Sequence, residues 1–340
     1  MKKVVISIIG MMFVLVVLAA VGGYLYVNSI WNQPTQVLKE TFFVPKGKGV
    51  SWVANQLESK GVIPNADVFK LMHRLKYTSI QVKAGEFDLS KPLSQHELIS
   101  KFDKGEVVLY QVTLIDGWSF KQFKQHLIKQ ELLVPKIQDL SDDEILTAVG
   151  AEEAHPEGLF APETYFFQKG DSDLDILKRS YQKQKEIVQN AWQQFSQHSQ
   201  HDELSAHIDT PYKALILASI IEKETGKESE RETISGVFYN RLKINMKLQT
   251  DPTVIYGMGD AFDGNIRRKN LRTDTPYNTY TRFGLPPTPI AMPGKASIEA
   301  ALNPEATEAF YFVGKGDGSH YFSKNLKEHN NAVRKYQLGK

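Results

Sequence analysis

The stretch ALILASIIEKETG, residues 214–226, runs eight apolar or small residues directly into two glutamates. A helix built on that run is hydrophobic all round, so we expect it to be buried and the fold to be organised around it. Thr210 and Pro211 ahead of the run are typical of an N-cap and a first helical residue. Gly226 is expected to follow the helix as its left-handed C′ residue.

Glu222 and Glu224 fall in the last turn of this predicted helix. Residues two apart lie about 200° apart around a helix, so the two carboxylates are expected to point to opposite sides. Burial disfavours the charged form of a carboxyl and raises its pKa, which suits a group that donates a proton near neutral pH. The alternative is that both glutamates end a helix in water, although negative charge is mildly unfavourable there. Spacing alone does not rank the two residues.

The composition excludes several classes of function. The length of 340 residues suits two domains, or two domains and an anchor. A net charge of +2 gives no reason to expect nucleic acid as a partner, and the absence of cysteine excludes disulfides, thiolate catalysis and sulfur-ligated zinc. His320 and His329 are too far apart in the sequence to suggest a metal site, and no HExxH motif occurs. We therefore expect neither a metal nor a cofactor.

The N-terminus has the length and composition of a membrane anchor. Residues 4–27 contain no charged side chain, and about 20 apolar residues are enough for a helix to cross the hydrocarbon core. Lys2 and Lys3 are expected to stay in the cytoplasm, which leaves the rest of the chain outside it. The alternative is a signal peptide cleaved near residues 19–22. We assign residues 1–27 to a cytoplasmic tip and anchor, and residues 28–39 to a polar linker.

The remaining chain predicts an α+β fold in two parts. Residues 40–112 form a small α+β module whose strand–helix–helix–strand order resembles the LysM-like module of envelope proteins. Residues 113–340 form a larger α+β domain that carries the dense motifs. Within it, Ser229 and Glu232 are spaced as a capping box at the start of a second helix. Asp251 precedes Pro252, a pair that commonly starts a turn.

Six motifs occur in a fixed order along the chain: EGLFAPETY, ASIIEKET, LQTDPTVIYGMG, YNTY, GLPPTPI and GSHYFSKNLKEHN. Across roughly residues 40–335 they resemble the membrane-bound endolytic murein transglycosylases of the MltG (YceG-like) family. The resemblance implies a single membrane helix, a LysM-like subdomain and a catalytic domain with a lysozyme-like catalytic helix. It also implies cleavage of the MurNAc–GlcNAc bond within nascent peptidoglycan strands, which leaves 1,6-anhydro-MurNAc ends and terminates glycan elongation.

The resemblance ranks the glutamates and suggests further site residues. Lysozyme-like lytic transglycosylases have a catalytic Glu followed by Ser at a helix end, and Glu224-Thr225 matches that pair with Thr in place of Ser. Those enzymes also carry a Gln-bearing loop and a Tyr-Asn motif, which resemble Gln249 and Tyr277-Asn278 here. The resemblance therefore assigns the catalytic role to Glu224. The candidate substrate-binding residues are Glu222 (also the runner-up for the acid), Thr225, Gln249, Asp251, Tyr277, Asn278, Tyr280 and Tyr165.

The implied mechanism needs one carboxyl group. Glu224 protonates the leaving oxygen and then takes the proton of the muramic C6 hydroxyl, which closes on C1 without consuming water. A glycoside hydrolase normally uses two carboxylates, so Asp251 facing Glu224 would instead indicate a two-carboxylate peptidoglycan hydrolase. A non-catalytic, membrane-anchored murein-binding scaffold is a further alternative.

The implied surroundings follow from the same resemblance. The substrate is the peptidoglycan glycan strand, and the chain is a single-pass protein of the cell inner membrane with a periplasmic catalytic domain. Peptidoglycan synthases or division proteins are the implied protein partners, because strand cleavage must be coupled to strand synthesis.

Overall fold

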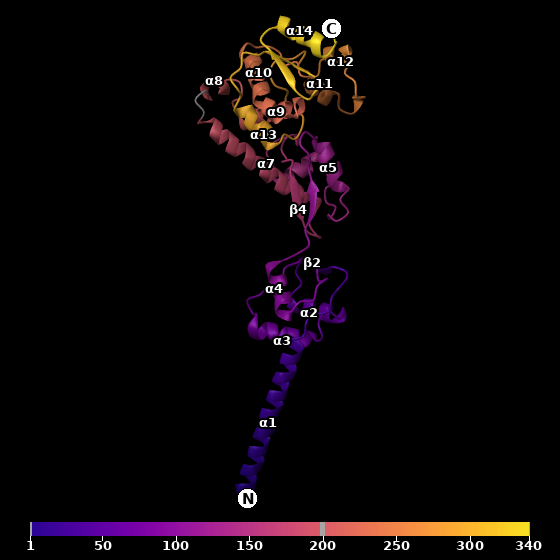
Figure 1. Cartoon of the computed structure of the whole chain (residues 1–340), viewed down its shortest axis with the longest axis vertical. Coiled ribbons are helices and arrows are strands. Elements are labelled where there is room, and N and C mark those ends of the chain that lie inside the picture. Colours follow the sequence, from indigo (N-terminus) through magenta and orange to yellow (C-terminus); the bar gives the residue numbers. More distant parts are fainter. Residues whose placement is uncertain (1, 198–200, 340) are drawn as a thin grey trace. The chain divides into compact units, whose positions relative to one another are not determined.

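The structure, a computed structural model, describes residues 2–197 and 201–339 as an α+β chain (Figure 1). The predicted α+β class is confirmed. The chain divides into two compact units. The first unit comprises the chain up to Tyr110 together with Phe166–Gly170, and the second comprises Gln111–Tyr165 and the chain from Asp171 onward.

The first helix, α1 (Lys2–Trp31), is long and apolar enough to cross a membrane over Ile6–Trp31. It runs past residue 27, where the anchor was predicted to end. Trp31 is 8% exposed, and its ring lies 6.0 Å from that of Phe69 and 5.9 Å from that of Tyr77. Trp31 is buried in the core of the first unit. Helix α1 therefore continues into the segment that we assigned to a linker from its polar composition.

The rest of the predicted linker is also bound to the first unit. The backbone N–H groups of Thr35, Gln36 and Leu38 donate to carbonyl oxygens of that unit at 2.7, 2.9 and 3.0 Å. The assignment of residues 28–39 to a polar linker stays a prediction, but the main chain of this segment is hydrogen-bonded to the first unit. A polar sequence can still be fixed in place when its main chain is hydrogen-bonded, and composition does not reveal that.

The first unit is a small α+β structure. Its strands β1 (Phe42–Val44) and β2 (Gly85–Phe87) pair antiparallel, with Phe42 opposite Phe87. The helices are α2 (Val50–Ser59), α3 (Ala66–Lys76) and α4 (Gln95–Lys104). Helix α4 begins at the N-cap Ser94 and is followed by the left-handed Gly105. The strand–helix–helix–strand order is thus present, while its likeness to LysM modules stays a prediction.

The second unit is mostly helical. Strands β3 (Tyr110–Thr113) and β4 (Thr164–Phe167), whose residues are divided between the two units, pair with each other. Within the second unit, β5 (Tyr311–Gly314) pairs antiparallel with β6 (His320–Ser323). The helices are α5 (Phe120–Ile128), α6 (Asp142–Val149), α7 (Asp173–Phe195), α8 (His201–Ser205), α9 (Pro211–Glu224), α10 (Arg231–Lys243), α11 (Asp251–Met258), α12 (Arg268–Arg272), α13 (Lys295–Leu302) and α14 (Leu326–Tyr336). Two 3-10 turns, η1 (Glu228–Glu230) and η2 (Gly259–Ala261), adjoin α10 and α11.

Helix α9 lies at the centre of this unit, as its all-apolar sequence predicts. Its residues 214–221 are all buried, and it packs against α7, α10, α11 and α13 (Figure 1). A helix with no solvated face can only be accommodated with neighbours on every side. The end of α9 is therefore the point at which the chain leaves the core.

A glycine brings α10 close to the segment that precedes β5. A Cβ at Gly236 would lie 2.3 Å from the carbonyl oxygen of Glu305, so only glycine permits this approach. One turn later, the Asn240 amide donates to the carbonyl oxygens of Thr307 and Ala309 at 2.7 and 3.0 Å. This contact fixes the β5–β6 hairpin beside the end of α10.

Candidate active site

Helix α9 ends at Glu224, and the chain then turns sharply. Thr210 caps its start, and Pro211 is the first helical residue, as predicted. Thr225 is extended (φ −145°, ψ 135°), and its Oγ1 accepts a hydrogen bond from Lys227 N at 3.0 Å. Gly226 does not adopt the left-handed conformation that was predicted for it. The extended threonine already redirects the chain, so a left-handed glycine is not needed.

Glu222 faces a buried polar cluster beside α13. Its Oε2 accepts a hydrogen bond from Gly294 N at 3.0 Å, and its Oε1 lies 3.8 Å from the Arg231 guanidinium. Asp116 is close by, and burial followed by the charge of Glu222 raises the pKa of that aspartate. Glu222 is thus surrounded by protein groups that satisfy its charge.

Glu224 faces a different environment, as the 200° separation predicts. It lines a pocket of about 410 Å³, and its Oε1 accepts a hydrogen bond from the Thr250 hydroxyl. Burial raises the pKa of Glu224, and the charge of Asp251 adds to this effect. The hydrogen bond from Thr250 and the charges of His320 and Arg241 lower this pKa, but the net shift is upward. Glu224 is therefore suited to hold a proton at a pH where an exposed glutamate would be ionised.

Buried threonines hold the loop that presents Thr250 to Glu224. The backbone N–H of Thr250 donates to Thr279 Oγ1 at 3.1 Å, and the Thr253 hydroxyl donates to the Thr250 carbonyl oxygen at 2.7 Å. Gln249 N donates to the Thr279 carbonyl oxygen at 3.1 Å, and Gln249 has a positive φ of 49°. A non-glycine residue in that conformation needs such support from its surroundings. The loop is consequently fixed relative to the end of α9.

Four of the residues singled out in the sequence line the same pocket: Glu224, Gln249, Asp251 and Tyr280. The Tyr280 hydroxyl donates to Asp251 Oδ1 at 2.6 Å, which links α11 to the YNTY loop. All four side chains are amides, phenols or carboxylates that can hydrogen-bond sugar hydroxyl and N-acetyl groups.

Other predicted site residues have structural contacts instead. Asn278 is fully buried, and its amide donates to the carbonyl oxygens of Asn270, Leu271 and Thr273 at 3.2, 3.2 and 2.7 Å. It therefore shapes the loop before it. Tyr165 is 8% exposed, and its hydroxyl donates to the Ala161 carbonyl oxygen at 2.8 Å, so it belongs to the core.

Tyr277 and Thr225 are likewise engaged by neighbouring protein groups. The Tyr277 hydroxyl lies 2.9 Å from Thr288 Oγ1, and its ring packs edge-on against Tyr256 at 4.9 Å. Thr225 is only 4% exposed. The expectation that these two residues bind sugar receives no support from such contacts.

The pocket also contains Arg241, which the sequence analysis did not single out. Its guanidinium is buried, donates from Nε to the Phe310 carbonyl oxygen at 2.7 Å, and lies 5.2 Å from the centre of the Tyr311 ring. Burial lowers the pKa of Arg241. The sequence contains one indication that Arg241 is buried. It lies three residues after Phe238, so the two side chains are on the same face of the predicted helix.

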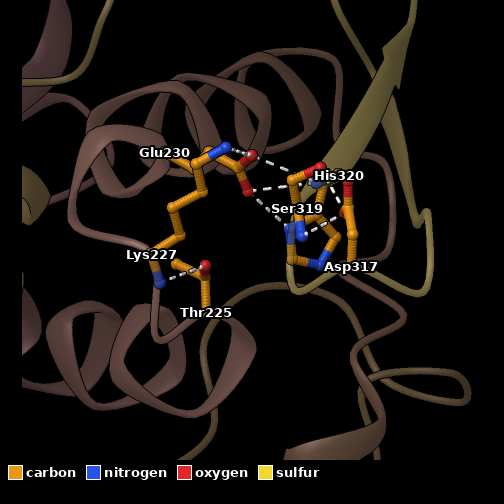
Figure 2. A network of polar contacts seen from close by, with 6 residues as sticks. All are labelled: Thr225, Lys227, Glu230, Asp317, Ser319 and His320. Atoms are coloured by element: carbon orange, nitrogen blue, oxygen red, sulfur yellow. Dashed lines mark hydrogen bonds and ion pairs between the residues drawn. The ribbon is translucent and has the colours of Figure 1, made fainter.

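A glutamate–histidine pair at the pocket was missed as well (Figure 2). His320 N donates to Glu230 Oε1 at 3.1 Å, and His320 Nδ1 lies 2.7 Å from Glu230 Oε2. Burial by itself would raise the pKa of Glu230, but the hydrogen bonds from His320 and Lys227 hold it below the ordinary value. The two residues are 90 positions apart, so no spacing pattern could join them.

The same region corrects the predicted capping box. Glu230, not Ser229, is the N-cap residue of α10, and no side chain caps that helix. Glu232 Oε1 instead accepts a hydrogen bond from Asn303 Nδ2 at 3.2 Å. Ser229 of the predicted box lies in the 3-10 turn η1, which places Glu230 beside His320.

His329 completes the titratable groups of the pocket. Its ring stacks on Tyr311 with centroids 5.2 Å apart, and burial lowers its pKa. Within residues 2–197 and 201–339, no three His, Asp or Glu side chains are grouped as metal ligands would be. The carboxyl, amide and phenol groups that line the pocket can transfer protons and form hydrogen bonds.

Two features define the class of protein. One is a helix able to span a membrane, and the other is an α+β unit that presents one partly buried acid in a polar pocket. The chain belongs to the YceG-like family, whose model matches residues 42–335. The family suggested by the six sequence motifs is thereby confirmed.

Relatives and one solved structure agree with this assignment. The endolytic murein transglycosylase of Bacillus subtilis (strain 168) is 33% identical over 335 residues, which cover 93% of this chain and 90% of the relative. That of Streptococcus pneumoniae (strain ATCC BAA-255 / R6) is 26% identical and is matched over 87% of this chain but only 58% of its own length. A crystal structure of a yceG-like protein from Listeria monocytogenes is 31% identical, with a TM-score of 0.52, and covers 87% of this chain and 99% of that one.

Proposed function

We propose that this chain is an endolytic murein transglycosylase that cleaves the MurNAc–GlcNAc bond within nascent peptidoglycan strands. The names of its relatives support the activity. The observation that carries the proposal is Glu224, a carboxyl group at the end of a buried helix, whose pKa is raised by burial and which lines a polar pocket. Such a group can donate a proton at a pH where an ordinary carboxyl cannot.

Glu224 acts first as an acid and then as a base in this proposal. Thr250 occupies Oε1, so the transferable proton resides on Oε2 and passes to the glycosidic oxygen as the bond to C1 breaks. The muramic C6 hydroxyl then closes on C1, helped by the substrate's N-acetyl group, and yields a 1,6-anhydro end. Because the attacking hydroxyl belongs to the substrate, its proximity supplies several kcal/mol without a bound water.

Gln249, Asp251 and Tyr280 bind the sugar in this proposal. All three line the pocket with Glu224, and the Tyr280–Asp251 hydrogen bond orients the aspartate. Each can exchange a hydrogen bond with hydroxyl or N-acetyl groups.

A second candidate is a two-carboxylate peptidoglycan hydrolase. Asp251 lines the same pocket and is near enough for its charge to raise the pKa of Glu224. In a hydrolase, Asp251 would act as nucleophile or as base toward water. The two candidates differ in their products, because a hydrolase leaves reducing ends and a transglycosylase leaves ends that are lighter by one water.

The proposed location follows from α1. Lys2 and Lys3 precede its apolar stretch, so the N-terminus remains in the cytoplasm and both units lie on the outer side of the cell inner membrane. The periplasmic enzyme would then meet glycan strands as they are made. Peptidoglycan synthases or division proteins are the partners that this position favours.

The test is the substitution Glu224→Gln in the full chain, with digestion of purified murein followed by zymography and mass spectrometry. General acid–base catalysis contributes about 10²- to 10⁴-fold, so we expect activity to fall by at least about 100-fold. Wild-type digests are expected to contain ends lighter by one water than hydrolysed ends.

The matched control is Glu222→Gln, two positions away in the same helix. Because Glu222 is bound to Gly294 and Arg231, its substitution is expected to lower thermal stability while leaving cleavage measurable. Full activity of Glu224→Gln, with loss in a folded Glu222→Gln protein, would reverse the assignment. Reducing ends alone would establish the hydrolase, and murein that stays uncleaved by wild type would favour a binding scaffold.

A further inference from the structure

Helix α3 packs against the end of the helix that can span a membrane. Trp31 is the last residue of α1, and its ring contacts those of Phe69 in the first turn of α3 and Tyr77 at its C-cap. Val27 and Ile30 of α1 also pack against the core of the first unit. Folded protein therefore contacts α1 along its last turn.

The length of α1 places this contact close to the hydrocarbon core of a membrane. A core about 30 Å thick is crossed by roughly 20 residues of helix at about 1.5 Å each. Counted from Ile6, where the apolar segment begins, the core ends near Leu25. Val27 and Trp31 then lie about 3 and about 9 Å further out, and the headgroup layer is roughly 5–8 Å thick. The first unit thus begins inside the headgroup layer.

Helix α3 has one side that no part of the first unit covers. Phe69 and Met72 are buried in the core, and Trp31 packs on a second side. The third side, here called the outer face, carries Leu71, Arg74 and Leu75, which lie three and four residues apart along the helix. Figure 1 shows α3 at the end of the first unit from which α1 leaves, with α4 and β2 beyond it. The side of α3 turned away from the core therefore faces the membrane.

The two leucines of the outer face are exposed to 42% and 69%. Single exposed leucines are ordinary on a protein surface, but these two lie one turn apart and form a continuous apolar strip. Basic residues in the last turn of a helix are favoured by the helix dipole, which could explain Arg74 and Lys76. The dipole gives no reason for the exposed leucines beside them.

The outer face also carries positive charge that no protein carboxylate balances. Asp67, one turn earlier, is paired with Lys70 at 3.0 Å. Arg74 and Lys76 are exposed and make no ion pair within the part of the chain that the structure describes. Outside α1, the first unit has twelve Lys or Arg against eight Asp or Glu, so its overall charge does not repel an anionic bilayer.

We propose that the outer face of α3 is a lipid-binding surface that binds anionic phospholipid in the headgroup layer of the membrane. Leu71 and Leu75 enter the boundary between headgroups and acyl chains, as the apolar side of an interfacial helix does. Arg74 and Lys76 donate hydrogen bonds to lipid phosphates. The inference rests on the membrane location proposed above and does not depend on the cleavage reaction. With both α1 and α3 in the membrane, the first unit cannot turn freely about its anchor.

The test uses single cysteines in the full chain, which has none of its own. Leu75→Cys carries an environment-sensitive fluorophore, in vesicles of phosphatidylcholine and phosphatidylglycerol that contain nitroxide lipids. We expect strong quenching by nitroxides just below the headgroups. Leu109→Cys is the matched control, because Leu109 is 60% exposed and follows Val108, whose N–H binds the Glu86 carbonyl oxygen on β2, away from α1 (Figure 1). Its label should not be quenched.

A second pair of variants tests the role of charge. Each basic residue at an anionic surface is expected to change the ratio of docked to undocked protein by about fivefold. Arg74→Gln with Lys76→Gln should therefore weaken lipid quenching at residue 75, and this effect should vanish in vesicles of phosphatidylcholine alone. Lys83→Gln with Lys104→Gln removes the same charge beside β2, where Lys83 Nζ donates to the Lys104 carbonyl oxygen at 3.3 Å, and should have no effect.

Three outcomes would overturn the proposal. The first is equal lipid quenching at residues 75 and 109. The second is protection of residue 75 from both nitroxide lipids and aqueous acrylamide, which would show that a second copy of the chain covers α3. The third is quenching at residue 75 that responds neither to phosphatidylglycerol nor to the loss of Arg74 and Lys76, which would exclude anionic lipid as the ligand.

Two measurements keep this inference separate from the proposed function. A label at Leu15→Cys, in the middle of α1, should be quenched by nitroxides deep in the acyl chains. Absence of that quenching would show that α1 does not span the bilayer, and the proposed location would fail. Digestion of purified murein by the labelled Leu75→Cys protein tests the cleavage reaction, whose outcome does not depend on whether α3 binds lipid.

Discussion

Glu222 and Glu224 show how two identical side chains in one turn of helix acquire different properties. Glu222 is bound by a backbone N–H and lies near a guanidinium, whereas Glu224 receives a threonine hydroxyl at the edge of a pocket. Desolvation outweighs the hydrogen bond at Glu224, so its pKa rises. The two glutamates thus differ because of the groups around each carboxylate at the end of the helix, since their residue type is the same.

The first residue-scale prediction concerns Thr250→Val. The Thr250 hydroxyl lowers the pKa of Glu224, so its removal should raise that pKa further and shift the falling limb of activity to higher pH. The orienting bond to the protonated acid is lost too, and a hydrogen bond between uncharged groups is worth about 0.5–1.5 kcal/mol, so kcat/KM should drop by roughly two- to tenfold. The measurement is kcat/KM on purified murein as a function of pH.

Thr250→Ser is the control for that substitution, because it keeps the hydroxyl and removes only a methyl group. Its profile should overlay that of the wild type. A falling limb that stays in place in Thr250→Val, or moves to lower pH, would show that the hydroxyl does not control the protonation of Glu224.

How much of the site was visible in the sequence can be judged residue by residue. The ALILASII run predicted a buried helix, and the spacing of its glutamates predicted their opposite environments, because helix geometry is local. Asn278 and Tyr165 were chosen by residue type, which does not distinguish a side chain that binds sugar from one that binds its own backbone. The Glu230–His320 pair depends on a tertiary contact and could not be predicted from any local pattern.

At the scale of elements, close packing of α10 places the hairpin at the pocket. Gly236 allows the helix to approach residues 305–307, and Arg241 then donates to the Phe310 carbonyl oxygen just before β5. The sequence predicted a helix that begins near Ser229, and α10 is that helix. It gave no indication that the C-terminal hairpin would complete the pocket at the end of α9.

Glu157 links two further elements and leads to a prediction about stability. It is 3% exposed, and it accepts hydrogen bonds from the N-terminal N–H of α5 (Phe120, 2.9 Å) and from the Tyr256 hydroxyl on α11 (3.1 Å). Burial outweighs both bonds and raises its pKa from 4.5 to about 7. The Glu157 carboxyl of the folded state therefore keeps its proton over a pH range in which the same carboxyl of the unfolded chain is ionised.

The expected result is a loss of stability as pH rises. The contribution of protonated Glu157 is complete below about pH 4.5 and is lost as pH passes through about 7. The shift corresponds to roughly 3 kcal/mol at most. Denaturant unfolding of wild type and Glu157→Gln from about pH 4 to about pH 8 should show the wild type losing stability relative to the variant by up to that amount.

Tyr256→Phe serves as the companion variant. Because the Tyr256 hydroxyl lowers the pKa of Glu157, its removal should extend the loss to higher pH. A difference between wild type and Glu157→Gln that is constant with pH, or that grows in the opposite direction, would contradict the protonated state of Glu157.

At the scale of the molecule, a helix able to span a membrane was predictable, because residues 4–27 contain no charged side chain. The join between anchor and first unit was not. Residues 28–39 are polar enough to suggest a linker, yet Trp31 lies in the core and Thr35 N donates to the Leu93 carbonyl oxygen at 2.7 Å. Ile30 and Leu38 in the same segment also pack against the core of the first unit.

Trp31→Ala tests whether the membrane helix and the first unit fold together. Trp31 packs against Phe69 and Tyr77, and truncation of a buried tryptophan costs about 3–5 kcal/mol. In the detergent-solubilised full chain, the unfolding transition of the first unit should therefore move to lower temperature. Cleavage of purified murein below that transition should persist, because Glu224 and its neighbours all belong to the second unit.

Tyr26→Ala is the matched control for the anchor. Tyr26 is on the same helix but is 60% exposed, so its truncation should leave the first transition where it is in the wild type. An unchanged first transition in Trp31→Ala would show that the anchor is joined loosely to the unit. A single transition that moves as a whole would show that the two units unfold as one, since a local cavity can only lower the stability of the cooperative unit that contains it.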